Sequence, residues 1–354
     1  MTAHLDPGKI ASDAKDGYPR GRLRLRGLLQ ALIGIIALAL VVMKSDLRGL
    51  VEVIRSARIA YLPVAAIASF AVTWLMAYRW GVILSVRPLR LSAYRLFRYY
   101  LIGIFFTNFA PGGGVGGDVA RLIYADREVR DKAFVLSTIF YERLVALFTI
   151  LLIGLVSTAA SRARLEADRA IIMGQVILGS AFILTAALMS DYVSSRLARL
   201  CRFAGARFNL ARAGEAAART IEAISGFRKH RRMLAVTLAL SILIRVVWGL
   251  GCYVVALALS LPLSPWLVFA FISIVDLVRM LPISVGGLGV REWLLIALFA
   301  QAGIEREQAL AFSLLAFAPI YLNAIAGGII YVSMARLKKE EKGVADFDLK
   351  RSEV

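Results

Sequence analysis

Long apolar runs separated by short basic segments dominate this chain of 354 residues. A helix needs about 20 apolar residues to cross the ~30 Å hydrocarbon core of a bilayer. Transmembrane β-strands alternate apolar and polar positions instead, so these runs argue against a β-barrel. We expect an all-α polytopic membrane protein with about six full spans. The predicted spans are residues 27–43, 61–86, 133–160, 170–189, 233–260 and 307–335.

Two further apolar segments are interrupted by glycine, one in each half of the chain. Residues 111–117 read Pro-Gly-Gly-Gly-Val-Gly-Gly, and residues 282–289 read Pro-Ile-Ser-Val-Gly-Gly-Leu-Gly. In both segments an arginine stands four residues after the second glycine of the Gly-Gly pair. Helices broken at corresponding positions of two halves are the best sequence indicator of a transporter's binding site. The two breaks are defined by Pro111, Gly116, Gly117, Pro282, Gly286, Gly287 and Gly289.

Both Gly-Gly pairs predict sharp turns, because glycine tolerates positive φ. A broken helix survives in hydrocarbon only where it is buried in protein or lines a watery cavity. A helix that restarts at Asp118 would use this side chain as its N-cap, and the free N–H groups there would favour an anion. Close helix packing through small residues is the simpler explanation, and the sequence leaves it open.

Basic residues outnumber acidic ones by 43 to 24, which gives a formal charge of +19. Most of the excess lies in tails and loops, above all in residues 190–232, where ten basic residues face three acids. Such residues hold loops in the cytoplasm and meet anionic lipid, so we expect no nucleic-acid binding. We expect a disordered tail at 1–26, a transmembrane domain at 27–336 and a charged tail at 337–354. Both termini should then lie on the cytoplasmic side of a bacterial inner membrane.

This orientation places the two broken segments on opposite faces of the membrane. If each is a re-entrant hairpin, the first enters from the cytoplasmic side and the second from the outside, the inverted arrangement of many transporters. One segment disagrees, because residues 44–60 should lie outside and yet carry Lys44, Arg48, Arg55 and Arg58. Snorkelling at the membrane surface is the only explanation that the sequence offers.

Charged residues inside the apolar segments are candidates for chemistry, since each costs at least ~2.5 kcal/mol at the bilayer centre. A rise of about 1.5 Å per residue places Glu142 and Arg143 near the middle of the membrane. Asp276 stands three residues before an arginine on the same helix face, so this pair is expected to form. The adjacent residues 142–143 and 291–292 point about 100° apart. Each of those four charges is therefore expected to find its partner elsewhere.

The embedded charges make a mildly cationic set of six arginines and four carboxylates. They are Arg79, Arg121, Arg143, Arg245, Arg279 and Arg291 with Asp118, Glu142, Asp276 and Glu292. Forked guanidinium groups suit phosphate oxygens, so an anionic or phosphate-bearing headgroup is the expected ligand. The expected headgroup ligands are Arg121, Arg143, Arg279, Arg291 and Asn108. The expected gates and ion pairs are Asp118, Glu142, Asp276, Glu292 and Arg245. Ion pairs that merely lock two helices together are the alternative.

Other chemistry finds little support. The two histidines and two cysteines lie far apart in the sequence, so neither a metal site nor a disulfide is expected. The first break lacks the Gly-Lys-Ser/Thr ending of a phosphate loop, and no Ser-His-Asp grouping is available. We expect no cofactor, and without an ATP motif any coupled transport would use an ion gradient.

The motifs around the two breaks resemble those of a known family. They read Asn108, Pro111, Gly116-Gly117-Asp118-x-x-Arg121, Glu142-Arg143, Asp276-x-x-Arg279-x-x-Pro282 and Gly286-Gly287-x-Gly289-x-Arg291-Glu292. The pattern resembles the flippase-like membrane domain family over roughly residues 27–336. This domain is the transmembrane region of lysylphosphatidylglycerol synthases, and it occurs alone in YbhN-like and HpnL-like proteins. The extra glycines at 112–114 depart from the pattern.

This resemblance implies a role in moving lipids between leaflets. The soluble lysyl-transferring domain of the synthases is not expected here, so their lipid-modifying activity is not carried over. We therefore expect a lipid flippase or transporter rather than an enzyme. One alternative is an integral-membrane transferase on a lipid carrier, with Asp276 or Glu142 as base. Another is an accessory subunit of a lipid-modifying complex that binds an envelope-biogenesis protein, and a homo-oligomer is also open.

Overall fold

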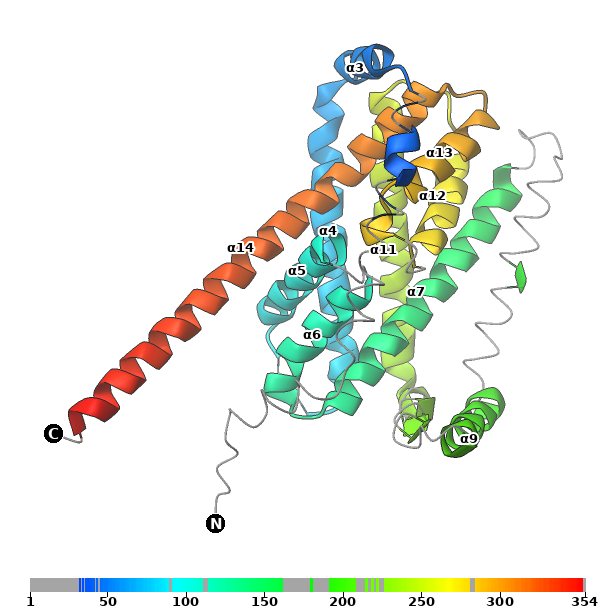
Figure 1. Cartoon of the computed structure of the whole chain (residues 1–354). Helices are drawn as coiled ribbons and strands as arrows, with labels where there is room; N and C mark the ends of the chain where they lie inside the picture. Colours follow the sequence, from blue (N-terminus) through cyan, green and yellow to red (C-terminus); the bar gives the residue numbers. More distant parts are fainter. Residues whose placement is uncertain are drawn as a thin grey trace.

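The computed structural model is a bundle of long helices (Figure 1). It describes residues 32, 34, 36–41, 43, 45–88, 91–110, 114–161, 179–180, 191–207, 214–215, 218–219, 221–222, 226–280 and 284–352. Every regular element in these residues is a helix, which confirms the all-α polytopic membrane fold. The predicted tail at 1–26, most of the spans at 27–43 and 170–189, and both Pro111 and Pro282 lie outside the described residues.

Four described helices are long and apolar enough to cross a membrane. They are α4 (Leu62–Leu84, preceded by the 3-10 turn η1, Ile59–Tyr61), α7 (Lys132–Ser161), α11 (Arg231–Ala258, preceded by η3, Phe227–Lys229) and α14 (Arg306–Ser352). Their apolar parts match the spans predicted at 61–86, 133–160, 233–260 and 307–335. The backbone of α14 stays helical through the segment that was expected to be a charged tail.

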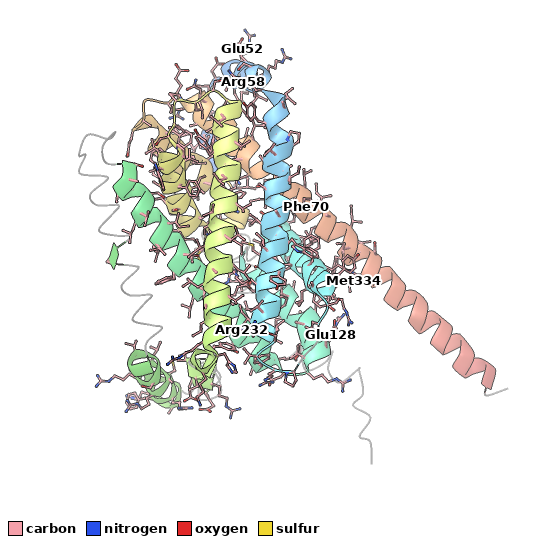
Figure 2. All side chains as sticks on the ribbon, turned by 180° about the vertical axis from the view of Figure 1, so that it is seen from behind. Glu52, Arg58, Phe70, Glu128, Arg232 and Met334 are labelled. Carbon is pink, nitrogen blue, oxygen red and sulfur yellow. The ribbon has the colours of Figure 1, made fainter. Side chains whose placement is uncertain are left out.

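Two helices mark the opposite ends of the bundle, α3 (Leu47–Ser56) and α9 (Asp191–Arg207). Figure 2 shows Glu52 and Arg58 at the α3 end, and Glu128 and Arg232 at the α9 end. The Arg58 N–H donates to the Ala258 carbonyl oxygen at 2.9 Å, which joins the start of α4 to the end of α11. These two spans are therefore antiparallel.

The glycine-broken segments form two hairpins that enter from opposite ends. The first consists of α5 (Ala93–Phe109) and α6 (Gly114–Val129), with both outer ends at the α9 end. The second consists of α12 (Pro265–Met280), the turn η4 (Val285–Gly287) and α13 (Val290–Ala300), with both outer ends at the α3 end. This opposed arrangement agrees with the one expected from the charge pattern.

Each half of the chain has the order span, hairpin, span, and the halves exchange partners. Helix α7, which follows the first hairpin, packs on α12 of the second. Helix α14, which follows the second hairpin, packs on α5 of the first, while α4 packs on α11. The two halves are thus related as inverted repeats, and each hairpin is held by the other half.

Buried aromatic side chains fill the interior on both sides of the bundle. Phe299, Phe312 and Phe317 lie in a core built from α11 to α14, with the first two rings 4.9 Å apart. A second core, under α4, α5 and α7, surrounds Trp80, whose ring N–H donates to Thr138 Oγ1 at 3.0 Å. Because lipid offers little hydrophobic driving force, such close packing holds membrane helices together.

Most of the basic segment at 44–60 folds as α3, which lies across one end of the bundle (Figure 1). Asp46 caps this helix by accepting from the Arg48 N–H at 2.9 Å. Leu50 is buried against the bundle, whereas Arg48 and Arg55 are exposed. The segment is an amphipathic helix at the end of the spans rather than a plain loop, and its polar face keeps Arg48 and Arg55 exposed.

Candidate functional site

A cavity of about 530 Å³ lies inside the bundle where the two hairpins meet. Asn108 and Gly114 line it from the first hairpin, and Ser284 and Gly286 line it from the second. Gly286 has φ +63°, and a Cβ placed on it would lie 3.0 Å from Asn108 Oδ1. The two breaks are therefore in direct contact, and the cavity belongs to both.

Charged side chains from five helices reach the cavity wall. The lining charges are Arg79, Arg121, Arg143, Arg245 and Arg279 with Asp118, Glu142 and Asp276. The five arginines exceed the three carboxylates by two formal positive charges. Much of the remaining wall is apolar, including Ile104, Phe140 and Trp248. Apolar walls with a few placed polar groups are the usual build of a small-molecule site.

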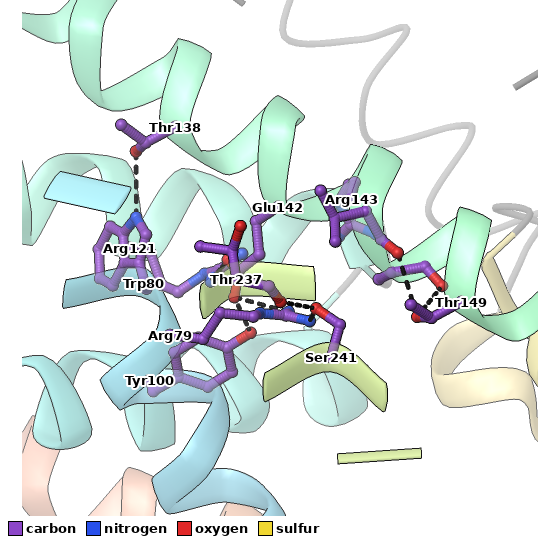
Figure 3. A network of polar contacts seen from close by, with 12 residues as sticks. Arg79, Trp80, Tyr100, Arg121, Thr138, Glu142, Arg143, Thr149, Thr237 and Ser241 are labelled. Atoms are coloured by element: carbon purple, nitrogen blue, oxygen red, sulfur yellow. Dashed lines mark hydrogen bonds and ion pairs between the residues drawn. The ribbon is translucent and has the colours of Figure 1, made fainter. Parts of the chain in front are cut away.

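Glu142 of α7 is the centre of a buried network (Figure 3). Its Oε1 accepts from Arg79 Nη2 at 2.9 Å and from the Tyr100 hydroxyl at 3.0 Å, and its Oε2 accepts from Arg121 Nη1 at 2.7 Å. Arg79 also donates to Ser241 Oγ at 2.7 Å. One carboxylate thus links five helices, α4, α5, α6, α7 and α11. Removing it would take the carboxylate partner from the buried Arg79 and one of two carboxylate partners from Arg121.

Asp118 of α6 bridges two arginines beside this network. Its Oδ1 accepts from Arg121 Nη2 at 2.7 Å, and its Oδ2 accepts from Arg143 Nε at 2.5 Å. Arg143 Nη2 also donates to the Gly114 carbonyl oxygen at 3.1 Å. The Arg143 side chain is 35% exposed, against 7% for Arg121. Among the paired cations of the cavity, Arg143 is the most accessible to a ligand.

A second ion-pair group lies on the α12 side of the cavity. Asp276 accepts from Arg245 Nη1 at 2.5 Å and from Arg279 Nη1 at 3.3 Å. The pairing of Asp276 with Arg279 agrees with the expected i,i+3 contact on one helix face. The Arg279 guanidinium also lies 4.8 Å from the centre of the Phe317 ring, a cation–π distance.

Arg291 and Glu292 pair with each other, which contradicts the expectation that each needs a partner elsewhere. Arg291 Nε donates to Glu292 Oε1 at 2.9 Å, while Glu292 Oε2 accepts from the Gly289 N–H at 2.7 Å. The 100° separation describes Cα–Cβ directions only, and the long guanidinium side chain curls back around the first turn of α13. Both residues are almost fully buried, and neither lines the cavity.

The two breaks differ in their backbone. Gly286, Gly287 and Gly289 all have positive φ, as the second Gly-Gly motif predicts. Gly116 and Gly117 instead lie inside α6, which begins at Gly114. The predicted turn at that first Gly-Gly pair is therefore wrong, and the chain breaks earlier.

The early start of α6 has two consequences. Asp118 sits in the second turn of the helix, so the prediction that it is the N-cap is also wrong, and its carboxylate is free to bridge arginines. Gly117 packs directly against the backbone of Gly103 in α5, where a Cβ would not fit. Close packing, the simpler explanation, therefore accounts for Gly117.

Several polar residues in or beside the cavity were missed or given no role from the sequence. Tyr100 and Ser241 complete the Glu142 network, but neither type stands out in an apolar helix. Asn323 of α14 donates to Thr73 Oγ1 at 2.9 Å and to the Ser69 carbonyl oxygen at 3.3 Å. An asparagine inside an apolar span is a signal that sequence reading can use, since such side chains join helices in membranes.

The charged groups of the cavity suit the binding of an anion that exchanges with a carboxylate at an arginine. The described part of the chain holds no group of three or more His, Cys, Asp or Glu side chains suited to a metal ion. Asp118, Glu142 and Asp276 each accept from two arginines. An anion that enters can replace a carboxylate oxygen at one arginine while that carboxylate keeps its second arginine.

Comparison with known proteins identifies the family to which this chain belongs. The family model described as the lysylphosphatidylglycerol synthase TM region matches residues 27–327. A UPF0104 membrane protein of Methanothermobacter thermautotrophicus is 21% identical over 298 residues, which cover 80% of this chain and 88% of the relative. A UPF0104 membrane protein of Pyrococcus horikoshii is 22% identical over 346 residues, which cover 88% and 98%. No solved structure matches the chain significantly. The family resemblance is thus confirmed, and the chain belongs to the family of the lysylphosphatidylglycerol synthase transmembrane region, whose name links it to lipid handling in membranes.

Proposed function

We propose that this protein moves lipids with anionic, phosphate-bearing headgroups between the two leaflets of a bacterial inner membrane. The observation that carries the proposal is the cavity, which has two excess positive charges inside a bundle of spanning helices. A charged group pays heavily to enter hydrocarbon alone. A cationic chamber at this depth gives a headgroup a polar route while its acyl chains remain in lipid.

Binding starts at Arg143, the most exposed of the paired cations. Its partner Asp118 is 19% exposed in the side chain, so a phosphate oxygen can approach the same Nε group and replace the carboxylate. Charge-assisted hydrogen bonds of this kind are about twice as strong as neutral ones. Asp118 keeps its second bond to Arg121 during the exchange.

The headgroup then passes from one ion-pair group to the other. Arg121 and Arg143 bind the headgroup first, beside the hairpin that enters at the α9 end. Arg245 and Arg279 bind it next, beside the hairpin that enters at the α3 end. The contact between the two hairpin tips separates the groups and serves as the gate. Glu142 and Asp276 hold the arginines in place when no lipid is bound.

Arg291 has a different role from the ligand role expected of it. It is buried against Glu292, which in turn accepts from Ser313 Oγ of α14 at 3.3 Å. Arg291 and Glu292 therefore position the second hairpin on α14 rather than touch the headgroup. Arg79 acts similarly, by holding Glu142 against α11 through Ser241.

The proposal is tested by lipid movement in vesicles. Purified protein is reconstituted with phosphatidylglycerol that carries a fluorescent acyl chain, and the leaflet distribution is followed by quenching with dithionite. Arg143→Gln removes charge-assisted bonds and should slow movement about tenfold. Arg48→Gln makes the same chemical change on exposed α3 and should leave the rate unaltered. A wild-type protein that moves no lipid, or an Arg143→Gln rate equal to wild type, would refute the proposal.

The geometry gives less support to a membrane transferase. A general base takes a proton from a substrate group within hydrogen-bond reach. Glu142 accepts from two arginines and a tyrosine, and Asp276 accepts from two arginines. Both carboxylates are therefore occupied as counter-ions. Formation of a modified lipid by the purified protein would favour the transferase instead.

A further inference from the structure

We propose that the acyl chains of the transported lipid project from the cavity between α6 and α7, through an opening that we name the α6–α7 mouth. The mouth is formed by Val115 and Val119 of α6 and Phe140 of α7. This inference rests on the proposed function, and it narrows the substrate to a molecule with hydrocarbon chains. A water-soluble anion would have no use for such an opening.

The mouth is identified by residues that line the cavity and are exposed at the same time. Val115, Val119 and Phe140 all line the cavity, and they are 59%, 46% and 47% exposed. Every other described residue of the lining is buried or only partly exposed. Among the described residues, the cavity is therefore open on one side, and that side faces outward between α6 and α7 rather than toward either end of the bundle.

Helical spacing places Arg143, the residue proposed to bind the headgroup, directly inside this mouth. Val115 and Val119 are four residues apart on one face of α6, and Asp118 lies beside them. Phe140 and Arg143 are three residues apart on one face of α7. The acyl chains of a lipid at this point would contact apolar side chains. Its phosphate would contact Arg143, the most exposed of the paired cations.

Arg143 also holds the two sides of the mouth together. Its guanidinium binds Asp118 and the Gly114 carbonyl oxygen, which both belong to α6, although Arg143 belongs to α7. A phosphate that takes over this guanidinium weakens the contact between the helices. Headgroup binding and widening of the mouth are therefore coupled through one side chain.

The test is to fill the mouth without touching the charges. Val119→Trp and Val115→Trp place a bulky side chain at the mouth, and each should slow the movement of two-chain phosphatidylglycerol about tenfold. The matched controls are Ile123→Trp on α6 and Val156→Trp on α7, whose native residues are 49% and 52% exposed but do not line the cavity. Both controls should move lipid at the wild-type rate.

A second lipid separates a narrowed mouth from a damaged protein. Single-chain lysophosphatidylglycerol needs less space, so Val119→Trp should slow it less than it slows the two-chain lipid. Equal slowing of both lipids, equal slowing by the control variants, or no slowing by either mouth variant would overturn the mouth. In those cases the proposed function still stands if wild type moves lipid and Arg143→Gln moves it about tenfold more slowly. If wild type moves neither lipid, the proposed function itself fails.

Discussion

Asn108 of α5 lies against Gly286 of η4, so two hairpins that enter from opposite ends of the bundle touch at their tips. A Cβ on Gly286 would lie 3.0 Å from Asn108 Oδ1 and 3.5 Å from Asn108 Cα. The contact also borders the cavity that carries the arginines. A movement of one hairpin should therefore displace the other, as the proposed gate for a headgroup requires.

Gly286→Ala should disturb this contact. The residue has φ +63°, which costs an L-residue about 1–2 kcal/mol, and the new Cβ would also press on Asn108. We expect a lower thermal midpoint and slower lipid movement. Gly303→Ala is the matched control, because Gly303 has φ +70° but nothing within 4 Å of its Cβ position. Equal losses for both variants would show that backbone strain, rather than the tip contact, is responsible.

Glu142→Gln should be among the most destabilising single changes in the cavity. It leaves Arg79 and Arg121 without their shared carboxylate, and breaking a buried pair typically costs about 3–5 kcal/mol. Glu128→Gln is the control, since Glu128 pairs with the half-exposed Arg95, and exposed pairs contribute about 0–1 kcal/mol. The measurement is unfolding of the purified protein in detergent. Equal stability of the two variants would contradict the central place of Glu142.

How much of this site follows from the sequence depends on the kind of evidence. Charge patterning predicts the opposed hairpins, because it reports which loops stay on one side of the membrane. Helical spacing predicts the contact between Asp276 and Arg279. It fails for Arg291 and Glu292, because a long side chain can curl back on its neighbour. That failure is one of side-chain flexibility rather than of helix geometry.

The first break shows a different limit. Gly-Gly is compatible both with a turn and with close helix packing, and only the neighbouring helix decides which applies. Gly117 faces Gly103 of α5, so packing applies, and α6 extends back to Gly114. Tyr100 and Ser241 were missed because their importance comes from a carboxylate on another helix. Contacts between distant helices do not appear in a single sequence without the fold.

The stability of the α9 end should fall at low pH. Asp131 caps α7 by accepting from the Phe134 N–H at 3.0 Å, and it accepts from Arg87 Nη1 at 2.7 Å. These contacts, the backbone N–H first, hold the pKa of Asp131 below its usual 3.8. Its contribution is therefore complete above about pH 4 and is lost as the pH falls through the lowered pKa.

Asp131→Asn tests this pH dependence, because asparagine also caps helices but does not titrate. The residue is partly exposed, so the loss at pH 7 should be only about 0.5 kcal/mol. The thermal midpoints of variant and wild type should converge as the pH falls below about 4. A constant difference across that range would show that the Asp131 charge contributes nothing to stability.

Contact of the basic loop with anionic lipid stays a prediction, and α9 gives it a defined surface. Leu197, Leu200 and Phe203 are 37%, 59% and 71% exposed on one face of the helix. The opposite face holds Ala198, which is 1% exposed, and Arg202, which pairs with two glutamates. A basic helix with an outward apolar face is typical of the membrane surface.

A fluorescent label at Leu200→Cys, in a Cys201→Ser and Cys252→Ala background, should report this contact. We expect its emission to shift to shorter wavelength in phosphatidylglycerol vesicles and less so in phosphatidylcholine vesicles. The same label at Ala206→Cys lies about 120° around the helix and should respond less. Identical spectra at both positions in both vesicles would contradict the assigned face.

The central claim is that the cationic cavity selects an anionic headgroup. It is tested most directly by comparing the rates at which the wild-type protein moves phosphatidylglycerol and phosphatidylcholine with identical labelled chains. We predict faster movement of phosphatidylglycerol by about tenfold or more, and loss of this preference in Arg143→Gln. Equal rates for the two lipids in the wild-type protein would contradict the claim.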